Sequence, residues 1–142
     1  MRIIPFEPSY RDDLIFMILT AKNALGCVPR LNEDLLDIPA HYAADGAFYL
    51  AIDETNRVIG SVGIQIRDHT ARLHRLFILP SLKRRGIGSA LLETAEAFAR
   101  KKEAREVIVH LGDPQYYWES ACFYPHHGYT EFAPRWMRKE LK

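Results

Sequence analysis

The chain has 142 residues, of which 48% are hydrophobic and 26% are charged. This balance favours one compact domain over residues 1–142 and excludes a disordered tail. A formal net charge of +1 gives no strong field toward nucleic acid or an anionic membrane. No signal segment or membrane-length apolar run is visible and only two cysteines occur, so we expect a cytoplasmic protein with reduced thiols, no disulfide and no structural metal.

The first part of the chain predicts a strand followed by two helices. Residues 3–6 form a short apolar run, and Pro8 opens a helix with apolar residues at helical spacing that ends at Gly26 and Pro29. Asn32 is expected to cap the second helix, which Pro39 breaks or kinks. The side chains expected to face inward from this second helix are Leu35, Leu36, Ile38 and Tyr42.

A β-hairpin and a third strand are predicted next. Residues 47–52 and 58–66 flank a polar turn, and residues 72–79 form a strand that stops at Pro80. Gly60 and Gly63 lie inside the second strand of the hairpin and indicate a bulge or a close neighbour.

The last part of the chain predicts helices alternating with strands. A helix begins near Ile87 and ends in the basic residues 100–102, and residues 107–111 read as a buried strand. Asp113 and Pro114 predict the start of another helix that ends near Gly128. Two strands, residues 129–132 and 136–141, complete an α/β (α+β) domain with a mixed central sheet of about seven strands flanked by about four helices.

A glycine-rich turn between a strand and a helix carries the strongest local signal. Glycine at two positions removes side chains that would block a pyrophosphate, while helix N-terminal amides attract its oxygens. Three cations can add charge-assisted contacts. The turn reads Lys83, Arg84, Arg85, Gly86, Ile87, Gly88 and Ser89.

This turn alone does not identify a ligand. A helix start with a solvated basic cluster has the same composition. The chain has no Gly-x-x-x-x-Gly-Lys-[Ser/Thr] motif, and Leu91 stands where a dinucleotide fingerprint needs a third small residue. A second motif is therefore required.

The second motif lies downstream, at residues 121–129. It contains Phe123 and Tyr124, with Gly128 four residues after Tyr124 and Tyr129 directly after Gly128. Together the two segments resemble the GNAT superfamily of N-acetyltransferases, whose acetyl-CoA loop reads [Gln/Arg]-x-x-Gly-x-[Gly/Ala] and whose later helix ends in Phe-Tyr-x-x-x-Gly-[Phe/Tyr]. The likeness is tightest over residues 58–92 and 123–129. It implies a GNAT-like fold and an acetyl-CoA-dependent acyltransferase.

The resemblance also implies residue roles. Residues 83–89 would hold the pyrophosphate, and pantetheine would enter a notch beside the preceding strand and pair with Phe77, Ile78 and Leu79. A backbone N–H there, that of Ile78 among them, would stabilise the tetrahedral oxyanion. Tyr124 matches the tyrosine that protonates the departing thiolate, and a phenol has an acidity close to that of an alkyl thiol.

Two positions depart from the family pattern. Lys83 replaces the usual Gln or Arg but keeps a donor. Tyr117 stands where many members carry an Asn that contacts pantetheine, so whether Tyr117 takes over that contact stays open.

The base that removes the proton of the amine is not assigned. Relatives carry a Glu where this chain has Arg72 or Gly112. The alternatives are water or one of four side chains: His74, His110, Asp113 and Glu119. The neighbouring His126 and His127 are interpreted as a turn and not as metal ligands, because adjacent residues rarely share one ion.

The sequence leaves the acceptor open. The resemblance implies that residues 21–42 and the hairpin determine the acceptor. In the first of these segments Glu33, Asp34 and Asp37 could attract a cationic amine or simply favour a helix start. The expected partners are acetyl-CoA, as the acetyl donor, and an amine, without nucleic acid or membrane; a homodimer stays open. Two other hypotheses are a non-catalytic acetyl-CoA-binding regulatory module and, against the modest net charge, a nucleic-acid-binding domain.

Overall fold

The computed structural model describes residues 1–28, 30–42 and 44–142. Pro29, expected to help end the first helix, lies outside these residues. The strands are β1 Arg2–Pro5, β2 Gly46–Ile52, β3 Val58–Arg67, β4 Thr70–Ile78, β5 Glu106–His110, β6 Thr130–Ala133 and β7 Trp136–Glu140. The α-helices are α1 Arg11–Ala24, α2 Ile38–Tyr42, α3 Ile87–Lys101 and α4 Ser120–His126. Short 3₁₀ turns occupy Pro8–Tyr10, Glu33–Leu36 and Pro80–Leu82.

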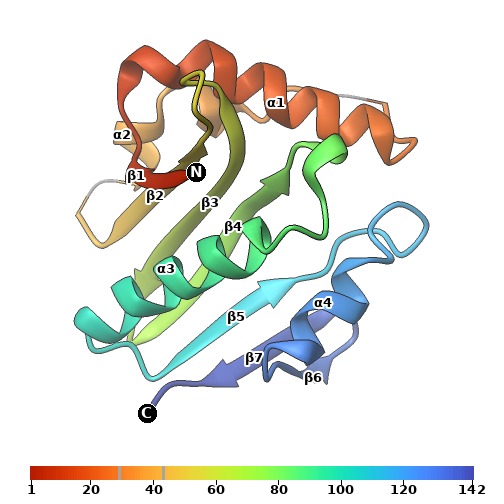
Figure 1. Cartoon of the computed structure of the whole chain (residues 1–142). Coiled ribbons are helices and arrows are strands. Elements are labelled where there is room, and N and C mark those ends of the chain that lie inside the picture. Colours follow the sequence, from red (N-terminus) through yellow and green to blue (C-terminus); the bar gives the residue numbers. More distant parts are fainter. Residues whose placement is uncertain (29, 43) are drawn as a thin grey trace.

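The strands form one mixed sheet in the order β1-β2-β3-β4-β5-β7-β6 (Figure 1). Helices α3 and α4 cover one face, and α1 and α2 cover the other. Leu91 and Val107 lie in the core of the first face, and Leu14 and Ile18 lie in that of the second. The predicted fold class is confirmed. Among the described residues, no helix combines the length and apolar character needed to span a bilayer.

Strands β4 and β5 separate soon after they pair. Their parallel register runs only from Thr70 opposite Glu106 to Arg72 opposite Ile108, and Figure 1 shows the two strands diverging beyond it. No continuous ladder joins the ends of the two strands. This divergence leaves a notch in the sheet.

A β-bulge at Arg75 accompanies the divergence. Between the pairs Gly63–His74 and Ser61–Phe77, β4 contains one residue more than β3. Arg75 has a φ of 55°, in the left-handed region, and its carbonyl accepts a 2.7 Å hydrogen bond from the Ser61 hydroxyl. A bulge bends its strand, which directs the end of β4 away from β5.

The two glycines of β3 have the close neighbours that the sequence predicts. A Cβ atom at Gly63 would lie 2.7 Å from the ring of Tyr42, and one at Gly60 would lie 2.9 Å from Leu91. Side chains at these positions would force the layers of the domain apart. The predicted bulge is also confirmed, because the β3–β4 register shifts between Ser61 and Gly63.

The predicted helix at Asp113 is wrong in its start, because α4 begins at Ser120. The Asp113 carboxylate accepts the N–H of Gln115 at 2.9 Å, and its carbonyl accepts the N–H groups of Tyr116 and Tyr117. These bonds close a local turn. Residues 114–119 consequently form turns along one side of the notch instead of a helix.

The predicted second helix is divided at Asp37. Asn32 does not cap it, because the Asn32 amide oxygen accepts a hydrogen bond from the Lys22 ammonium. Pro39 lacks an N–H and fits only a first helical turn, so α2 starts afresh, and the Asp37 carboxylate accepts the N–H of Ala40 at 3.3 Å. Leu36, expected to face inward, is 46% exposed.

Candidate functional site

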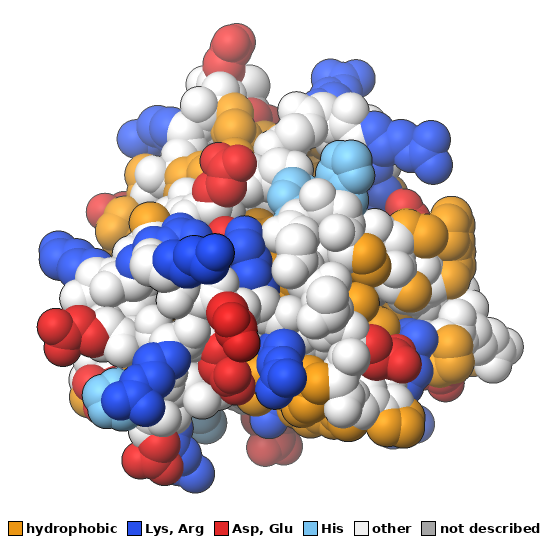
Figure 2. Space-filling view, turned by 90° about the horizontal axis from the view of Figure 1, so that it is seen from below, with side chains coloured by type: hydrophobic (Ala, Val, Ile, Leu, Met, Phe, Trp, Pro, Cys, Tyr) orange, Lys and Arg blue, Asp and Glu red, His pale blue; other side chains and the backbone are white. Residues whose placement is uncertain are grey.

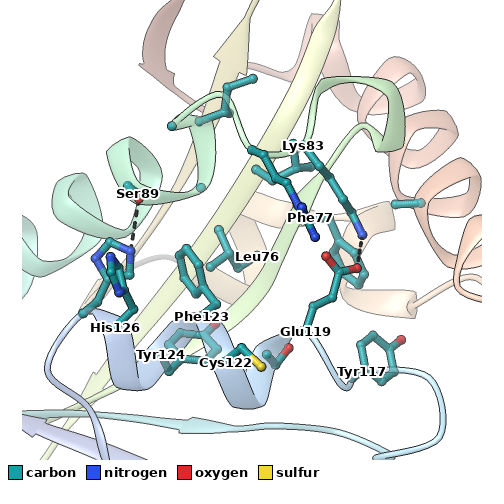
Figure 3. A pocket seen from close by; sticks show the side chains of 18 of the residues that line it. Leu76, Phe77, Lys83, Ser89, Tyr117, Glu119, Cys122, Phe123, Tyr124 and His126 are labelled. Carbon is teal, nitrogen blue, oxygen red and sulfur yellow. Dashed lines mark hydrogen bonds and ion pairs between the residues drawn. The ribbon is translucent and has the colours of Figure 1, made fainter.

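A cavity of about 610 Å³, here called the main cavity, lies at the notch (Figure 3). Its walls come from the end of α1, the end of β4, the loop into α3, the first turn of α3, and residues between 117 and 127. Of the site residues predicted from the sequence, those that line it are Phe77, Ile78, Lys83, Arg84, Gly86, Ile87, Gly88, Ser89, Tyr117, Glu119 and Tyr124.

The loop into α3 owes its shape to residues with left-handed backbone conformations. Arg84 has a φ of 64°, and Gly86, the N-cap of α3, has a φ of 81°. A Cβ at Gly86 would meet nothing within 4 Å, so glycine is favoured there by conformation. A Cβ at Gly88 would lie 3.4 Å from the ring of Phe123, so Gly88 lets α4 approach α3.

The first turn of α3 offers free backbone donors. The first N–H to bond back along the chain is that of Ala90, to the carbonyl of Gly86 at 3.0 Å. The amides of the residues before this one have no partner within the helix, and the N-terminal end of a helix carries a partial positive charge. The loop therefore presents a site for an anion beside the cations Lys83 and Arg84.

The end of β4 also has backbone groups on one edge that do not pair with a neighbouring strand. The N–H of Leu79 donates to the carbonyl of Ile59 at 2.9 Å, and successive residues of a strand direct their N–H groups to opposite sides. The N–H of Ile78 therefore points away from β3 and toward the notch, and that of Phe77 points toward β3.

Two of the predicted cofactor-binding residues lie outside the cavity lining. The carbonyl of Leu79 accepts the N–H of Leu82 at 2.9 Å, so both backbone groups of Leu79 are already bonded and it has none left for pantetheine. Arg85 is exposed and does not line the cavity. The sequence alone could not separate these two residues from their neighbours.

Tyr124 lies on α4 at the base of the notch. Its side chain is 5% exposed and packs edge-on against the rings of Phe123 and Tyr129, at centroid distances of 5.1 and 5.3 Å. Burial raises the pKa of the Tyr124 hydroxyl, and no described residue accepts a hydrogen bond from it. Its proton is therefore retained at neutral pH, and burial makes the hydroxyl a weaker acid than an ordinary phenol.

Two side-chain links cross the main cavity. The Lys83 ammonium lies 2.7 Å from the Glu119 carboxylate, and the Ser89 hydroxyl lies 3.1 Å from Nε2 of His127 (Figure 3). Sequence reasoning missed both links, because each joins residues more than thirty positions apart. They connect the loop and the start of α3 to the segment that carries Tyr124.

A buried polar cluster supports Tyr124 from behind. Glu96 on α3 is 4% exposed, accepts a 2.8 Å hydrogen bond from the Tyr129 hydroxyl, and lies 3.1 Å from the Lys139 ammonium. The sequence contains a sign of this cluster. Glu96 lies one helical turn after Leu92, on the apolar face of α3 that packs on the sheet, where a charged residue needs a partner. The cluster joins α3 to the strand pair that follows α4.

A second cavity of about 260 Å³ borders the first and shares Leu76, Phe77, Tyr117, Ser120 and Tyr124 with it. The structure places His74 and His110 in its lining. Nε2 of His74 is buried without a hydrogen-bond partner in the described chain. Burial, with the charges of Arg72 and Arg75, lowers the pKa of His74 to about 4.

The other base candidates are engaged in local bonds. Nδ1 of His110 accepts the N–H of Gly112 at 3.1 Å, and the Asp113 carboxylate closes its turn. Glu119 is paired with Lys83. Of the four candidates, only His74 lines a cavity beside Tyr124 with a ring nitrogen that is both buried and unpartnered.

The charge pattern of the surface bears on the alternatives. On the face shown in Figure 2, acidic side chains lie among the basic ones across the width of the molecule. Such mixing differs from the basic stripe typical of nucleic-acid binding. Within residues 1–28, 30–42 and 44–142, no three His, Cys, Asp or Glu side chains gather in a group that could hold a metal ion.

Solved acetyltransferase structures share this fold. A GNAT-family acetyltransferase from Staphylococcus aureus Mu50 superposes with a TM-score of 0.91 at 22% identity, over 99% of each chain. The PaiA N-acetyltransferase from Thermoplasma acidophilum, solved with coenzyme A, gives a TM-score of 0.79 at 18% identity, over 99% of this chain and 100% of that one. A GNAT-family acetyltransferase from Brucella melitensis, solved with acetyl-CoA, gives a TM-score of 0.74 at 17% identity, over 99% and 88%.

Comparisons of the sequence itself test the family without using these superpositions. No curated protein gives a significant match to the chain. The family model described as "Acetyltransferase (GNAT) domain" matches residues 44–131, which is more than half of the chain and includes both motifs. The chain therefore belongs to the GNAT family of acetyltransferases.

Proposed function

We propose that residues 1–142 form a single N-acetyltransferase domain, which moves the acetyl group of acetyl-CoA to a primary amine by direct transfer in a ternary complex. The amine belongs to a small molecule or to a peptide or protein. The observation that carries this proposal is the junction of the two cavities. Tyr124 lines both, so a donor in one and an acceptor in the other would meet beside its hydroxyl.

The main cavity suits the donor. The pyrophosphate would lie at the start of α3, where the free amides and the cations Lys83 and Arg84 gather. Pantetheine would follow the free edge of β4 at Ile78 into the notch. The complexes of the T. acidophilum and B. melitensis proteins with coenzyme A and acetyl-CoA support this assignment.

The transfer itself requires few protein groups. The amine enters uncharged after giving a proton to water, and its nitrogen attacks the thioester carbon. The N–H of Ile78 stabilises the negative oxygen of the tetrahedral intermediate. The C–S bond then breaks, the thiolate takes the proton of Tyr124, and the nitrogen gives up its extra proton through water to restore Tyr124.

A non-catalytic acetyl-CoA-binding module is the second candidate. It is favoured by the weak basicity of His74 and by the pairing of Glu119, which leave proton removal to water. The hydroxyl of Tyr124 has no partner in the described chain and favours the enzyme instead.

Two measurements on the full chain separate these candidates. Acetyl-CoA at high micromolar concentration should raise the melting temperature, and a panel of amines should include at least one that releases free CoA thiol. Stabilisation without thiol release from any amine would support the module. A melting temperature that acetyl-CoA leaves unchanged would rule out both candidates.

A further inference from the structure

The second cavity is positively charged. Arg72 and Arg75 of β4 line it, and none of its described lining residues carries a carboxylate. Arg75 is neutralised from outside the lining, because its guanidinium lies 3.0 Å from the Asp34 carboxylate. Arg72 has no carboxylate within ion-pair distance in the described chain. One uncompensated cation therefore faces the cavity.

The side chain of Arg72 is held in place by an aromatic ring. Its guanidinium carbon lies 4.9 Å from the centre of the Trp136 ring. A stacked guanidinium keeps its N–H groups in its own plane, where they can bind both oxygens of one carboxylate. Stacking also reduces the rotamer freedom that a long side chain loses when it binds an anion.

His110 adds a second donor beside Arg72. Its ring also packs on Trp136, at a centroid distance of 4.9 Å. Because Nδ1 accepts the N–H of Gly112, the neutral ring carries its proton on Nε2. Arg72, His110 and Trp136 thus combine a fixed cation, a neutral donor and an aromatic support.

We propose that Arg72 and His110 bind a carboxylate of the acceptor, and that the acceptor is a small amino carboxylate whose primary amine lies at the other end of the second cavity. This inference rests on the proposed acetyl transfer. At that other end, the unpartnered Nε2 of His74 would accept a hydrogen bond from the amine, beside Tyr124. A dicationic acceptor would instead place a second positive charge against Arg72.

Two of the three acidic residues that could attract a cationic acceptor, Asp34 and Asp37, already have local partners, whereas Glu33 is exposed. Asp34 is bonded to Arg75 and to the hydroxyl of Tyr42, at 3.0 Å each. Asp37 accepts the N–H of Ala40 at the start of α2. Both carboxylates thus have local partners.

The sheet indicates the spacing between the two ends of the acceptor. Trp136 lies on β7, which is separated from β4 by β5. Trp136 pairs with His110 of β5, beyond the last β4–β5 pair at Arg72 and Ile108, where the two strands have diverged. The carboxylate site therefore lies more than one strand spacing, about 4.8 Å, from the strand that carries His74. This spacing favours an amine and a carboxylate joined by several methylene groups.

The test compares three acceptors of similar length with acetyl-CoA as donor: 5-aminopentanoate, its methyl ester and 1,5-diaminopentane. We expect kcat/KM for the acid to exceed that for the ester by about tenfold or more, as for a charge-assisted hydrogen bond, with the diamine poorest. Arg72→Gln should remove this preference by raising KM for the acid, and it should leave the affinity for acetyl-CoA unchanged. Arg72→Lys should restore part of it.

Arg138→Gln is the matched control. Arg138 is also stacked on an aromatic ring, Phe132, at 5.4 Å, but it does not line either cavity. This variant should keep the preference for the acid. Equal kcat/KM for the acid and the ester, or an undiminished preference in Arg72→Gln, would overturn the proposal.

A binding measurement keeps the test independent of turnover. Glutarate, a dicarboxylate, should shift the indole N–H resonance of Trp136 in the wild type and not in Arg72→Gln, with Trp136→Phe assigning the signal. If glutarate leaves that resonance unchanged, the carboxylate site is refuted even when no amine is acetylated. If glutarate shifts it but acetyl-CoA does not bind, the acetyl-transfer proposal fails and the carboxylate site stands.

Discussion

The Lys83 ammonium lies 2.7 Å from the Glu119 carboxylate, and this ion pair joins the loop before α3 to the turn before α4 across the main cavity. Both side chains are about one-third exposed, at 34% and 37%. In the proposed complex Lys83 would also contact the pyrophosphate. The carboxylate of Glu119 and the anionic donor therefore compete for one cation.

Glu119→Gln should bind acetyl-CoA more tightly, because Lys83 no longer has to leave a carboxylate. We expect a two- to fivefold lower Kd, roughly the strength of an exposed ion pair, with kcat unchanged. Titration calorimetry and initial rates would measure both. Glu93→Gln, at an exposed position on α3, should change neither. A large loss of kcat in Glu119→Gln would instead identify Glu119 as the base.

Gly86→Asp should abolish acetyl-CoA binding, because it places a carboxylate where the pyrophosphate is proposed to lie. Gly86 has a φ of 81°, so any side chain adds strain. Gly86→Asn is the matched variant, since Asn has the same shape, tolerates left-handed backbone and carries no charge. We expect about a hundredfold or more between their Kd values, from the loss of charge-assisted contacts and added repulsion. Similar Kd values would refute the loop assignment.

Tyr124→Phe should lower kcat by about tenfold or more while leaving the Kd for acetyl-CoA unchanged, because only the proton donor is removed. Since the pKa of Tyr124 is raised by burial, its proton is lost only at a pH above that of an ordinary phenol, and kcat should not fall before then. Tyr49→Phe, at a half-buried tyrosine that packs on Phe98, is the control. Full activity in Tyr124→Phe would remove the proposed acid.

The free energy of unfolding should decrease as the pH falls, because of the lowered pKa of His74. Its pKa is about 4 in the folded chain, against 6.5 for an unperturbed histidine, because of burial and the nearby Arg72 and Arg75, which outweigh Asp34. Between these values the unfolded chain binds a proton that the folded chain does not, so acid favours unfolding. This loss of unfolding free energy is absent above about pH 6.5 and complete below about pH 4.

The measurement compares urea unfolding at pH 7 and at about pH 4.5 for the wild type and His74→Gln. The variant should lose less stability between the two pH values than the wild type does. His41→Gln, at an exposed histidine, should lose as much as the wild type. Equal losses in the wild type and His74→Gln would contradict the lowered pKa.

Much of the fold follows from local patterns in the sequence. The apolar run from residue 58 to 66 predicts β3, its glycines Gly60 and Gly63 predict crowded neighbours, and the glycine-rich turn predicts the start of α3 near Ile87. These elements are predictable because burial and the backbone conformation at glycine both restrict the residue type at a position.

Other features could not be predicted from the sequence, because they depend on contacts between residues that are distant in the chain or on a choice between two local structures. Asn32 has the composition of a helix cap, but Lys22, ten residues earlier, takes its side-chain oxygen. Asp113 is equally suited to a helix or to a closed turn, and the turn forms. Nothing in the sequence around Arg72 indicates its proposed role, which depends on Trp136, brought beside it by the sheet.

The short parallel register between β4 and β5 divides the sheet into two hydrogen-bonded units. Strands β1–β4 form one unit and β5–β7 the other, and only the positions from Thr70 to Arg72 pair them. Amide hydrogen exchange should therefore report two protection levels, since a weakly joined unit opens without global unfolding. A donor that touches both sides of the notch would fasten the units together, so its binding would be visible as slower exchange in β5, far from the pyrophosphate.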